Sequence, residues 1–451
     1  MNYYSTNQNA EPVRFKEALL KGQAPDRGLY MPEQIPAMSA DEIGALAGKS
    51  YADIAFAVTH KFLAGEVPDD DLRTIVRDAY DFPLPLEAVR DHKYVMRLDR
   101  GPTASFKDFA ARMMGRLMQY FLHQEKRNLL ILTATSGDTG SAVANAFYGL
   151  DNIDVVVLYP ETEVSDRQRK QMTTLGQNIQ LIALDGKFDD CQALVKRAFA
   201  DPDLSHLPLS SANSINIGRL IPQIVYYFYA FANLCGTPEK DIIFSVPSGN
   251  FGDLMGGLLG KAMGLPVKKF VVAVNENDEF ATFVASKDYD KIVPSINCIS
   301  NAMNVGHPSN FARLVALYGG HIDEQGNLGH LPDMERIRRD IYAISIDDNA
   351  TKDTIKLAHA EHGLLLEPHG AVAWAGLRHY LHDHPEDDTA DQVCVSFETA
   401  HPAKFPDEIR DLLGIDPELP PSLQGLDGKD ESFITMPHDY AEFKQFLQHN
   451  Y

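Results

Sequence analysis

The sequence predicts an α/β protein with two parallel-sheet βα domains and an added N-terminal region that is mainly helical. Three observations support this prediction. From about residue 95 onward, short apolar runs alternate with amphipathic segments, as in repeated βα units. The run at residues 128–134 is almost entirely apolar, which is typical of a strand buried on both faces. Before residue 95, the apolar residues instead recur at helical spacing.

The first 95 residues are expected to form a separate helical domain. The spacing of apolar residues predicts helices at residues 13–21, 41–47, 51–63 and 69–80, with glycine and proline between them. The segment Phe82-Pro83-Leu84-Pro85 then breaks the helical pattern, because proline does not continue a helix. We therefore predict a domain at residues 1–95.

Residues 96–423 are expected to form the catalytic core. Strands are predicted at residues 95–98, 128–134, 155–159, 179–184, 242–246, 270–274 and 393–397. Helices are predicted at residues 139–148, 166–175, 190–200, 219–234, 251–263, 347–362 and 371–382. We expect a smaller subdomain at about residues 128–210, inserted in the larger one. A C-terminal extension at residues 424–451 is expected to consist of polar turns and one helix at 440–448.

Composition limits the possible functions. A net charge of −22 argues against a nucleic-acid or anionic-membrane partner. The four cysteines form no paired motif, which fits a reducing compartment. No apolar run reaches the roughly 18 residues of a membrane span, and no export signal is visible. We expect a cytoplasmic protein, monomeric or homodimeric, whose partner is a small molecule.

The segment around Lys107 is a candidate reactive site. Gly101-Pro102 predicts a turn, and Ser105 with Asp108 predicts a capping box at the start of an amphipathic helix. Lys107 then lies at the positive end of the helix dipole, which disfavours the ammonium form. A lysine with a depressed pKa can attack a carbonyl group. The alternative is an ordinary lysine that extends to solvent.

Three other loops place hydroxyls, amides and glycines at predicted helix N-termini, where free N–H groups favour an anion. Residues 133–140 could bind a carboxylate. Residues 245–253 resemble a phosphate cradle, although they lack the lysine of a Walker loop and the GxGxxG spacing. Residues 213–219 place Arg219 at a helix start, which a bound phosphate would explain. Each loop could instead be an ordinary capped turn, and Arg219 a solvated side chain.

Other catalytic templates do not match. Ser248 lacks the first glycine of a nucleophile elbow, because position 246 is valine. His359, Glu361 and His362 do not have the spacing of a zinc protease. We expect no structural metal.

Together these motifs resemble the threonine synthase family, whose members use pyridoxal 5'-phosphate (PLP) and share fold type II with the tryptophan synthase β-subunit. The resemblance covers nearly the whole chain. Besides the N-terminal helical domain, it rests on motifs that occur in family order: GPTASFKDF, TATSGDTGSAVANAFYG, NSINIGRL, SVPSGNFGDLMGG, SNAMNVGHPSN and TAHPAKF. Each motif alone is moderately specific, and their shared order is highly specific.

The resemblance implies a role for each matching residue. It implies that Lys107 is the catalytic lysine that holds the cofactor aldehyde and moves protons. The residues implied to contact PLP are Lys107, Gly249, Asn250, Phe251, Asp253 and Thr399, the last facing the ring nitrogen. Those implied to bind the substrate are Thr135, Ser136 and Thr139 for its carboxylate, and Asn213, Ser214 and Arg219 for its phosphate. The implied reaction converts O-phospho-L-homoserine and water to L-threonine and phosphate, the last step of threonine biosynthesis.

Three positions depart from the family pattern at the edge of the site. Asp99-Arg100 stands where Phe-His is often found, Glu398 where glycine is common, and Gly370 where threonine or alanine is frequent. Cofactor chemistry is therefore better determined than substrate preference. The alternatives are a threonine-synthase-like phospho-lyase that releases 2-oxobutyrate, another fold-type-II PLP lyase, or a catalytically silent binding module. The intact Lys107 and loops argue against the last.

Overall fold

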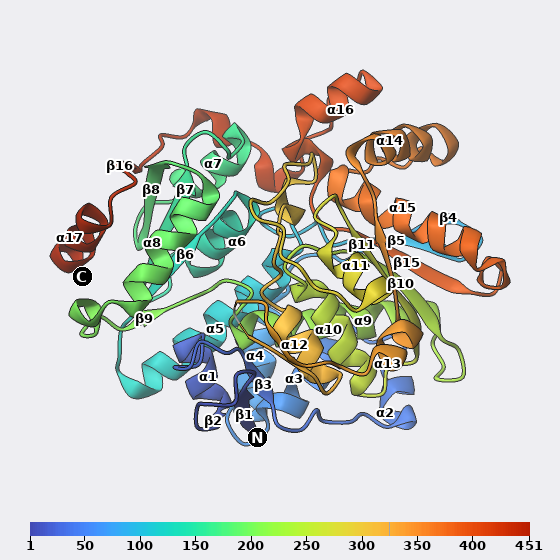
Figure 1. Cartoon of the computed structure of the whole chain (residues 1–451), viewed down its shortest axis with the longest axis horizontal. Coiled ribbons are helices and arrows are strands. Elements are labelled where there is room, and N and C mark those ends of the chain that lie inside the picture. Colours follow the sequence, from blue (N-terminus) through green and yellow to red (C-terminus); the bar gives the residue numbers. More distant parts are fainter. Residues whose placement is uncertain (324) are drawn as a thin grey trace.

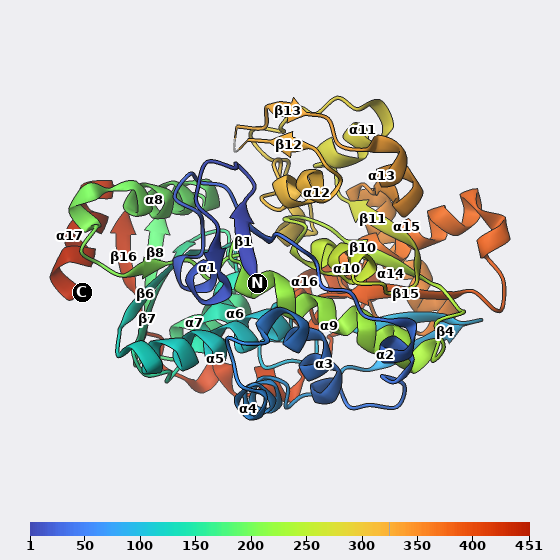
Figure 2. The ribbon, with the colours of Figure 1, turned by 90° about the horizontal axis from the view of Figure 1, so that it is seen from below.

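Two parallel β-sheets form the frame of the protein in the computed structural model, which describes residues 1–323 and 325–451. In Figure 1 the sheet of five strands lies on the left and the sheet of six strands on the right, with the N-terminal region along the lower edge. The view from below separates the two sheets in the same way and places the C-terminus beside the smaller sheet (Figure 2).

The larger sheet contains β4 (Leu86–Arg90), β5 (Lys93–Arg97), β10 (Ile242–Pro247), β11 (Val267–Val274), β14 (Ile341–Ser345) and β15 (Val393–Glu398). Its strand order is β14-β11-β10-β15-β5-β4. All neighbours are parallel except β4, which pairs antiparallel with β5. Every residue of β10 and β15 is buried, as expected for central strands covered on both faces.

The smaller sheet contains β6 (Leu129–Ala134), β7 (Ile153–Pro160), β8 (Ile179–Asp185), β9 (Leu209–Ser210) and β16 (Ile434–Pro437). Its order is β16-β8-β7-β6-β9, and all pairs are parallel. The predicted strands at residues 128–134, 155–159 and 179–184 correspond to β6, β7 and β8. The short strand β9 and the late strand β16 are additions that the sequence does not predict.

The helices of the core are α5 (Lys107–Glu125), α6 (Asp138–Phe147), α7 (Asp166–Thr173), α8 (Phe188–Ala200), α9 (Ile217–Leu234), α10 (Gly252–Ala262), α11 (Glu279–Ser286), α12 (Phe311–Leu317), α13 (Met334–Asp340), α14 (Asp348–His362), α15 (Pro368–Asp383) and α16 (Pro406–Leu413). α15 packs on β10, β11 and β15, whereas α8 packs on β6 and β7. α9 lies against α5 and α10. A two-stranded ribbon, β12 (His321–Ile322) with β13 (Leu328–His330), follows α12.

The N-terminal region contains the helices α1 (Phe15–Lys21), α2 (Ala40–Gly44), α3 (Tyr51–Leu63) and α4 (Asp69–Ala79), and the strands β1 (Asn2–Ser5), β2 (Val13–Arg14) and β3 (Tyr30–Pro32). The helices agree with the sequence prediction, but the antiparallel sheet β2-β1-β3 is not predicted. Its strands have only two to four residues, which is too short to display an alternating pattern. α3 packs on α9, so this region shares a hydrophobic core with the larger body.

The first predicted domain boundary, at residue 95, falls within a strand. A boundary at residue 95 would divide β5, and both β4 and β5 pair within the larger sheet. The proline-rich segment at residues 82–85 lies just before these strands. We therefore propose that the N-terminal region ends before β4.

The C-terminal extension completes the smaller sheet. β16 pairs with β8, and α17 (Tyr440–Asn450) then packs on α8. β16 has only four residues and three of them are exposed, so its sequence carries no hydrophobic alternation. Among the helices of residues 1–323 and 325–451, none is both long enough and apolar enough to cross a bilayer.

Candidate active site

Five loops leave the carboxyl ends of parallel strands. They connect β5 to α5, β6 to α6, β9 to α9, β10 to α10, and β15 to the 3₁₀ turn Pro402–Lys404. In open parallel sheets the carboxyl ends of the strands form the edge at which ligands bind. The sequence-predicted site residues all lie in these loops or in the first turns of the helices that follow them.

Lys107 is the first residue of α5, but the predicted capping box is wrong. The Asp108 carboxylate accepts hydrogen bonds from the N–H group (2.8 Å) and the hydroxyl (2.6 Å) of Thr103, not from Ser105. A Cβ atom added to Gly101 would overlap this carboxylate. Asp108 therefore folds the preceding turn onto the start of α5, which determines where Lys107 lies.

The Lys107 amine lies within a cluster of buried charges. Its side chain is 12% exposed, and its Nζ atom lies 3.8 Å from Asp138 Oδ2. Burial lowers the pKa of Lys107; Asp138 opposes this change, whereas Lys404 and Arg219 add to it. An amine with a lowered pKa can act as a nucleophile toward an aldehyde.

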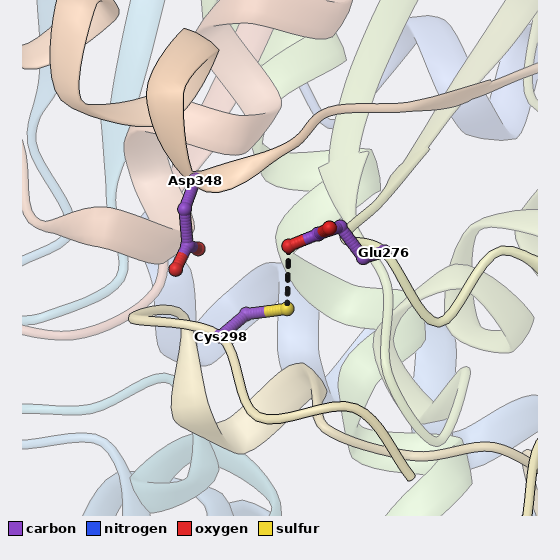
Figure 3. A group of neighbouring side chains, drawn as sticks. All are labelled: Glu276, Cys298 and Asp348. Atoms are coloured by element: carbon purple, nitrogen blue, oxygen red, sulfur yellow. Dashed lines mark hydrogen bonds between the residues drawn. The ribbon is translucent and has the colours of Figure 1, made fainter.

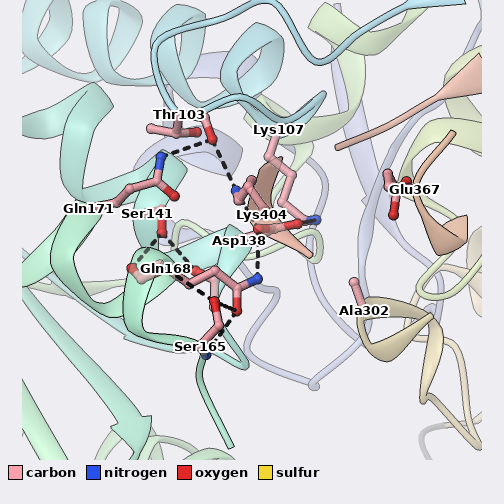
Figure 4. Close-up of polar contacts among 12 residues, drawn as sticks. Thr103, Lys107, Asp138, Ser141, Ser165, Gln168, Gln171, Ala302, Glu367 and Lys404 are labelled. Atoms are coloured by element: carbon pink, nitrogen blue, oxygen red, sulfur yellow. Dashed lines mark hydrogen bonds and ion pairs between the residues drawn. The ribbon is translucent and has the colours of Figure 1, made fainter. Parts of the chain in front are cut away.

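Asp138 links Lys107 to a second buried lysine (Figure 4). Lys404 Nζ lies 2.5 Å from Asp138 Oδ1 and donates a hydrogen bond to the Thr103 carbonyl oxygen at 3.0 Å. The Gln168 side chain donates to the same carboxylate oxygen at 3.0 Å. Burial alone would raise the pKa of Asp138, but the nearby Lys404 and Lys107 outweigh it and hold this pKa well below its ordinary value. Asp138 is therefore ionised.

The loop that opens α10 has the features of an anion cradle. Phe251 has a φ angle of 61°, which turns the chain into the helix. A Cβ atom on Gly249 would lie 2.8 Å from the Ala302 carbonyl oxygen, so only glycine fits there. Within residues 1–323 and 325–451, the N–H groups of Gly249, Asn250 and Phe251 donate no hydrogen bond. Free N–H groups at a helix N-terminus favour a phosphate.

Asn250 connects this cradle to the loop before α9. Its side-chain oxygen accepts hydrogen bonds from the Ser309 N–H group and hydroxyl, both at 3.2 Å, and its carbonyl oxygen accepts from the Asn310 side chain at 3.0 Å. The buried Arg313 donates to Asn310 Oδ1 (2.7 Å) and to the Ser214 carbonyl oxygen (3.2 Å). The structure thus joins the cradle to the loop that contains Ser214.

Thr135, Ser136 and Thr139 surround the start of α6. Thr135 Oγ1 accepts hydrogen bonds from the N–H groups of Gly137 (2.9 Å) and Gly140 (2.7 Å), so its hydroxyl hydrogen is left to be donated. Ser136 and Thr139 are partly exposed. This arrangement offers hydroxyl donors to a carboxylate beside a helix N-terminus.

Arg219 is a buried cation in the first turn of α9, and its side chain is incompletely paired. Its Nη1 atom donates to the Ala212 carbonyl oxygen (2.7 Å), but Nε has no hydrogen-bond partner among the described residues. The side-chain oxygen of Asn213 is also buried without one. Burial lowers the pKa of Arg219 to about 10. A buried charge of this kind is costly unless it is paired, so the loop suits an anionic ligand.

Thr399 and Asp253 complete the predicted set. The Thr399 carbonyl oxygen accepts a hydrogen bond from the Phe106 N–H group (2.9 Å), which fixes the end of β15 beside the start of α5. Asp253 Oδ1 accepts from the Leu254 N–H group (2.9 Å), and burial raises the pKa of Asp253 to about 6. Asp253 and Arg219 both interact electrostatically with Lys107, so the structure brings these three predicted residues together.

Two of the departures from the family pattern, Gly370 and Glu398, lie directly against each other. A Cβ atom on Gly370 would overlap the Glu398 carboxylate. Glu398 is fully buried; its Oε1 atom accepts from the Glu367 N–H group (2.9 Å), and its Oε2 atom has no partner among the described residues. Burial, and then the neighbouring Glu367, raise the pKa of Glu398 well above its ordinary value. The glutamate fits because position 370 lacks a side chain.

The sequence alone does not identify four residues that the structure places at the site: Asp138, Lys404, Ser309 and Asn310. Each lies inside a motif noted above, but its partner comes from a distant loop. For Asp138 the sequence shows only an acidic residue at the start of a helix. Acidic residues are common there as ordinary helix caps, so this position does not by itself indicate a site.

Glu276, Cys298 and Asp348 form another group of possible metal ligands, and it is the one such group among the described residues (Figure 3). The Asp348 oxygens accept from the Ile299 N–H group (3.1 and 3.3 Å), and the Cys298 thiol donates to Glu276 Oε2 (3.6 Å). Burial raises the pKa of Cys298 to about 11, so the thiol stays protonated near neutral pH. These contacts account for the cluster without a cation.

Comparison with known families gives matches across nearly the whole chain. Residues 2–80 match the family model described as threonine synthase N terminus. Residues 83–397 match the model of pyridoxal-phosphate dependent enzymes, and residues 371–447 match the model described as threonine synthase, C-terminal.

Individual relatives match over their full length. A threonine synthase of Serratia marcescens is 39% identical over 448 residues, which is 99% of each chain. The crystal structure of PLP-bound threonine synthase from Brucella melitensis has a TM-score of 0.91 at 36% identity, covering 100% of this chain and 99% of that one. The structure of threonine synthase from Escherichia coli has a TM-score of 0.89 at 36% identity and covers both chains completely. The predicted fold type II is therefore confirmed.

Proposed function

Because the chain belongs to the threonine synthase family of PLP-dependent lyases, we propose that it converts O-phospho-L-homoserine and water to L-threonine and phosphate. The observation that carries this proposal is the position of Lys107. Its amine lies among buried charges that include Arg219, and Arg219 itself lacks a carboxylate partner at hydrogen-bond distance among the described residues.

The residues present are suited to PLP. Lys107 offers an amine to the aldehyde, and the α10 loop offers unpaired N–H groups to the phosphate. We assign the cofactor contacts to Lys107, Gly249, Asn250, Phe251, Asp253 and Thr399. When bound, PLP supplies an electron sink for negative charge at the substrate carbons, while the protein supplies orientation and electrostatics.

The substrate has two anionic ends, and two loops are suited to them. We assign its carboxylate to the hydroxyl loop with Thr135, Ser136 and Thr139, and its phosphate to Asn213, Ser214 and Arg219. Hydrogen bonds between a guanidinium and a phosphate are stronger than neutral ones, and the unpartnered Arg219 Nε is available for such a bond.

Lys107 is the proposed proton carrier. The reaction removes protons from Cα and Cβ and releases phosphate from Cγ. Cγ then gains a proton, water adds at Cβ, and a proton returns to Cα. One base can serve several of these steps if it stays within reach and its pKa lies near the working pH. The lowered pKa of Lys107 favours this role.

A product assay tests the proposal. The purified protein is supplied with PLP and incubated with O-phospho-L-homoserine, and threonine, phosphate and 2-oxobutyrate are measured separately, with a sample lacking PLP as control. Equal yields of threonine and phosphate are expected. Formation of 2-oxobutyrate in place of threonine would instead identify a phospho-lyase, and failure to release phosphate would contradict both functions.

We further propose that the enzyme acts in the cytoplasm as a monomer or homodimer, without a nucleic-acid partner. Its four cysteines are buried and unpaired, which fits a reducing compartment. Its net charge of −22 disfavours binding to polyanions. Light scattering on the purified protein distinguishes monomer from dimer.

A further inference from the structure

The cluster around Asp138 contains two lysines that share one carboxylate unequally (Figure 4). Asp138 Oδ1 lies 2.5 Å from Lys404 Nζ and also accepts the hydrogen bond from Gln168. Asp138 Oδ2 lies 3.8 Å from Lys107 Nζ, which is beyond hydrogen-bond distance. The carboxylate is therefore committed to Lys404, although Lys107 lies beside it.

We propose that Lys404 is a positioning residue that holds Asp138 and so leaves the Lys107 amine without a hydrogen bond to a carboxylate. This inference rests on the proposed function, because it concerns the lysine that receives the cofactor. Lys404 is suited to the role because its side chain is fully buried and is also anchored on the Thr103 carbonyl oxygen. Thr103 lies in the turn before α5 and is hydrogen-bonded to Asp108, so the anchor of Lys404 is next to the start of the helix that holds Lys107.

The charges around Lys107 show how Lys404 affects the protonation of that amine. Besides Asp138 and Lys404, the charged groups that face Lys107 are Arg219, which favours the neutral amine, and Asp253, which favours the ammonium. Without a charge at position 404, Lys107 would become the main cation beside Asp138. An opposite charge at contact distance favours the ionised form of a group and shifts its pKa by about one to three units. For a lysine beside a carboxylate, this shift raises the pKa. A protonated Lys107 is not a nucleophile, so the carboxylate would then oppose capture of the aldehyde.

The test measures the protonation of Lys107 in the full-length protein prepared without PLP. The rate at which acetic anhydride labels Lys107 is followed by peptide mass spectrometry across a pH series, and its midpoint gives the ionisation of that amine. In Lys404→Met we expect the midpoint to rise by about one pH unit or more. The rate of PLP capture at neutral pH, followed by absorbance, should fall by about tenfold for each such unit.

Lys261→Met is a matched control. Lys261 also binds one carboxylate, Asp340 (3.0 Å), and one carbonyl oxygen, that of Val267 (2.8 Å), but it lies in the last turn of α10. Its loss should leave the Lys107 midpoint unchanged. Lys404→Arg keeps the charge and should retain the low midpoint. An unchanged or lower midpoint in folded Lys404→Met would overturn the proposal.

Asp138→Asn provides a second test that does not require the Lys404 variant to fold. Removal of the carboxylate should lower the Lys107 midpoint. Where Lys404→Met folds, the double variant Lys404→Met/Asp138→Asn should also lose the rise seen in Lys404→Met. A rise in Asp138→Asn would contradict the charge balance described here. These readouts involve no substrate, so a failed threonine assay with the expected midpoints would reject the proposed function and leave this inference standing.

Discussion

Lys107 and Arg219 share an unfavourable position, since each is a cation in the first turn of a helix, where the dipole opposes positive charge. Neither has a carboxylate at hydrogen-bond distance among the described residues. Such groups reduce stability unless a ligand supplies the missing charge. We expect substitutions at these two positions to affect ligand binding and turnover more than folding.

Lys107→Ala should abolish threonine formation and leave thermal unfolding nearly unchanged. The ion pair of the amine with Asp138 is long, at 3.8 Å, so its loss should cost little stability. The reaction, however, loses both its anchor for the cofactor and its proton carrier. Product analysis and circular dichroism on the same preparation check both parts. Lys61→Ala, which removes a lysine paired with Glu42 on the surface, serves as control. Normal turnover in Lys107→Ala would remove the basis of the assignment.

Arg219→Met should raise the KM for O-phospho-L-homoserine by roughly 10- to 100-fold, because hydrogen bonds to charged groups contribute about 1.5–3 kcal/mol. Competitive inhibition by inorganic phosphate should weaken in parallel. Arg338→Met is the control, since Arg338 also donates to main-chain oxygens, those of Val284 and Ala285, but lies on α13. Steady-state kinetics that match the parent enzyme would place the substrate phosphate elsewhere.

At the scale of elements, Glu398 at the end of β15 has room only because position 370, at the start of α15, is glycine. Gly370→Ala should destabilise the protein by about 1–3 kcal/mol, because the new methyl group overlaps the Glu398 carboxylate. Adding Glu398→Ala should recover most of this loss. Urea denaturation measures both effects. Gly428→Ala is the control, since a Cβ atom there meets nothing within 4 Å. Additive losses in the double variant would show that the two positions are independent.

α11 begins with a buried acid that makes stability depend on pH. Burial raises the pKa of Glu279 from 4.5 to about 8, and its Oε2 atom has no partner among the described residues. In the unfolded chain Glu279 loses its proton near pH 4.5, whereas in the folded protein it keeps this proton until about pH 8. Stability should therefore fall as pH rises between these values, by at most about 1.4 kcal/mol per pH unit.

Glu279→Gln should remove that dependence, so the variant gains stability over the parent protein between pH 5 and pH 8. Urea denaturation at both pH values measures the difference. The exposed Glu335→Gln should show no such gain. A constant difference between Glu279→Gln and the parent at the two pH values would show that Glu279 is ionised in the folded protein.

At the scale of the whole molecule, α17 closes the core of the smaller sheet. Phe443 is fully buried in the same apolar cluster as residues of β6, β7 and β8. Phe443→Ala should cost about 3–5 kcal/mol. Phe433→Ala, at a position 39% exposed, should cost far less. Equal losses in urea denaturation would mean that α17 does not contribute to that core.

The sequence predicts those parts of the molecule whose patterns are local. The apolar runs of β6 and β10 and the long apolar segment of α9 are long enough to identify strand or helix, and the site loops lie next to them. The strands of the N-terminal sheet and β16 are too short to show an alternation of apolar and polar residues. The capping box fails because Thr103 binds Asp108 instead. The ion pair between Lys404 and Asp138 joins two loops that follow strands of different sheets, so no local pattern predicts it.

The pairing of β16 with β8 has a consequence for synthesis on the ribosome. β8 emerges long before β16, so the growing chain carries an open sheet edge while most of the larger sheet is still being made. Exposed edges of this kind pair readily with other chains. We therefore expect nascent chains to be prone to aggregate from the emergence of β8 until β16 covers its edge, and chaperones that shield strand edges should improve the yield.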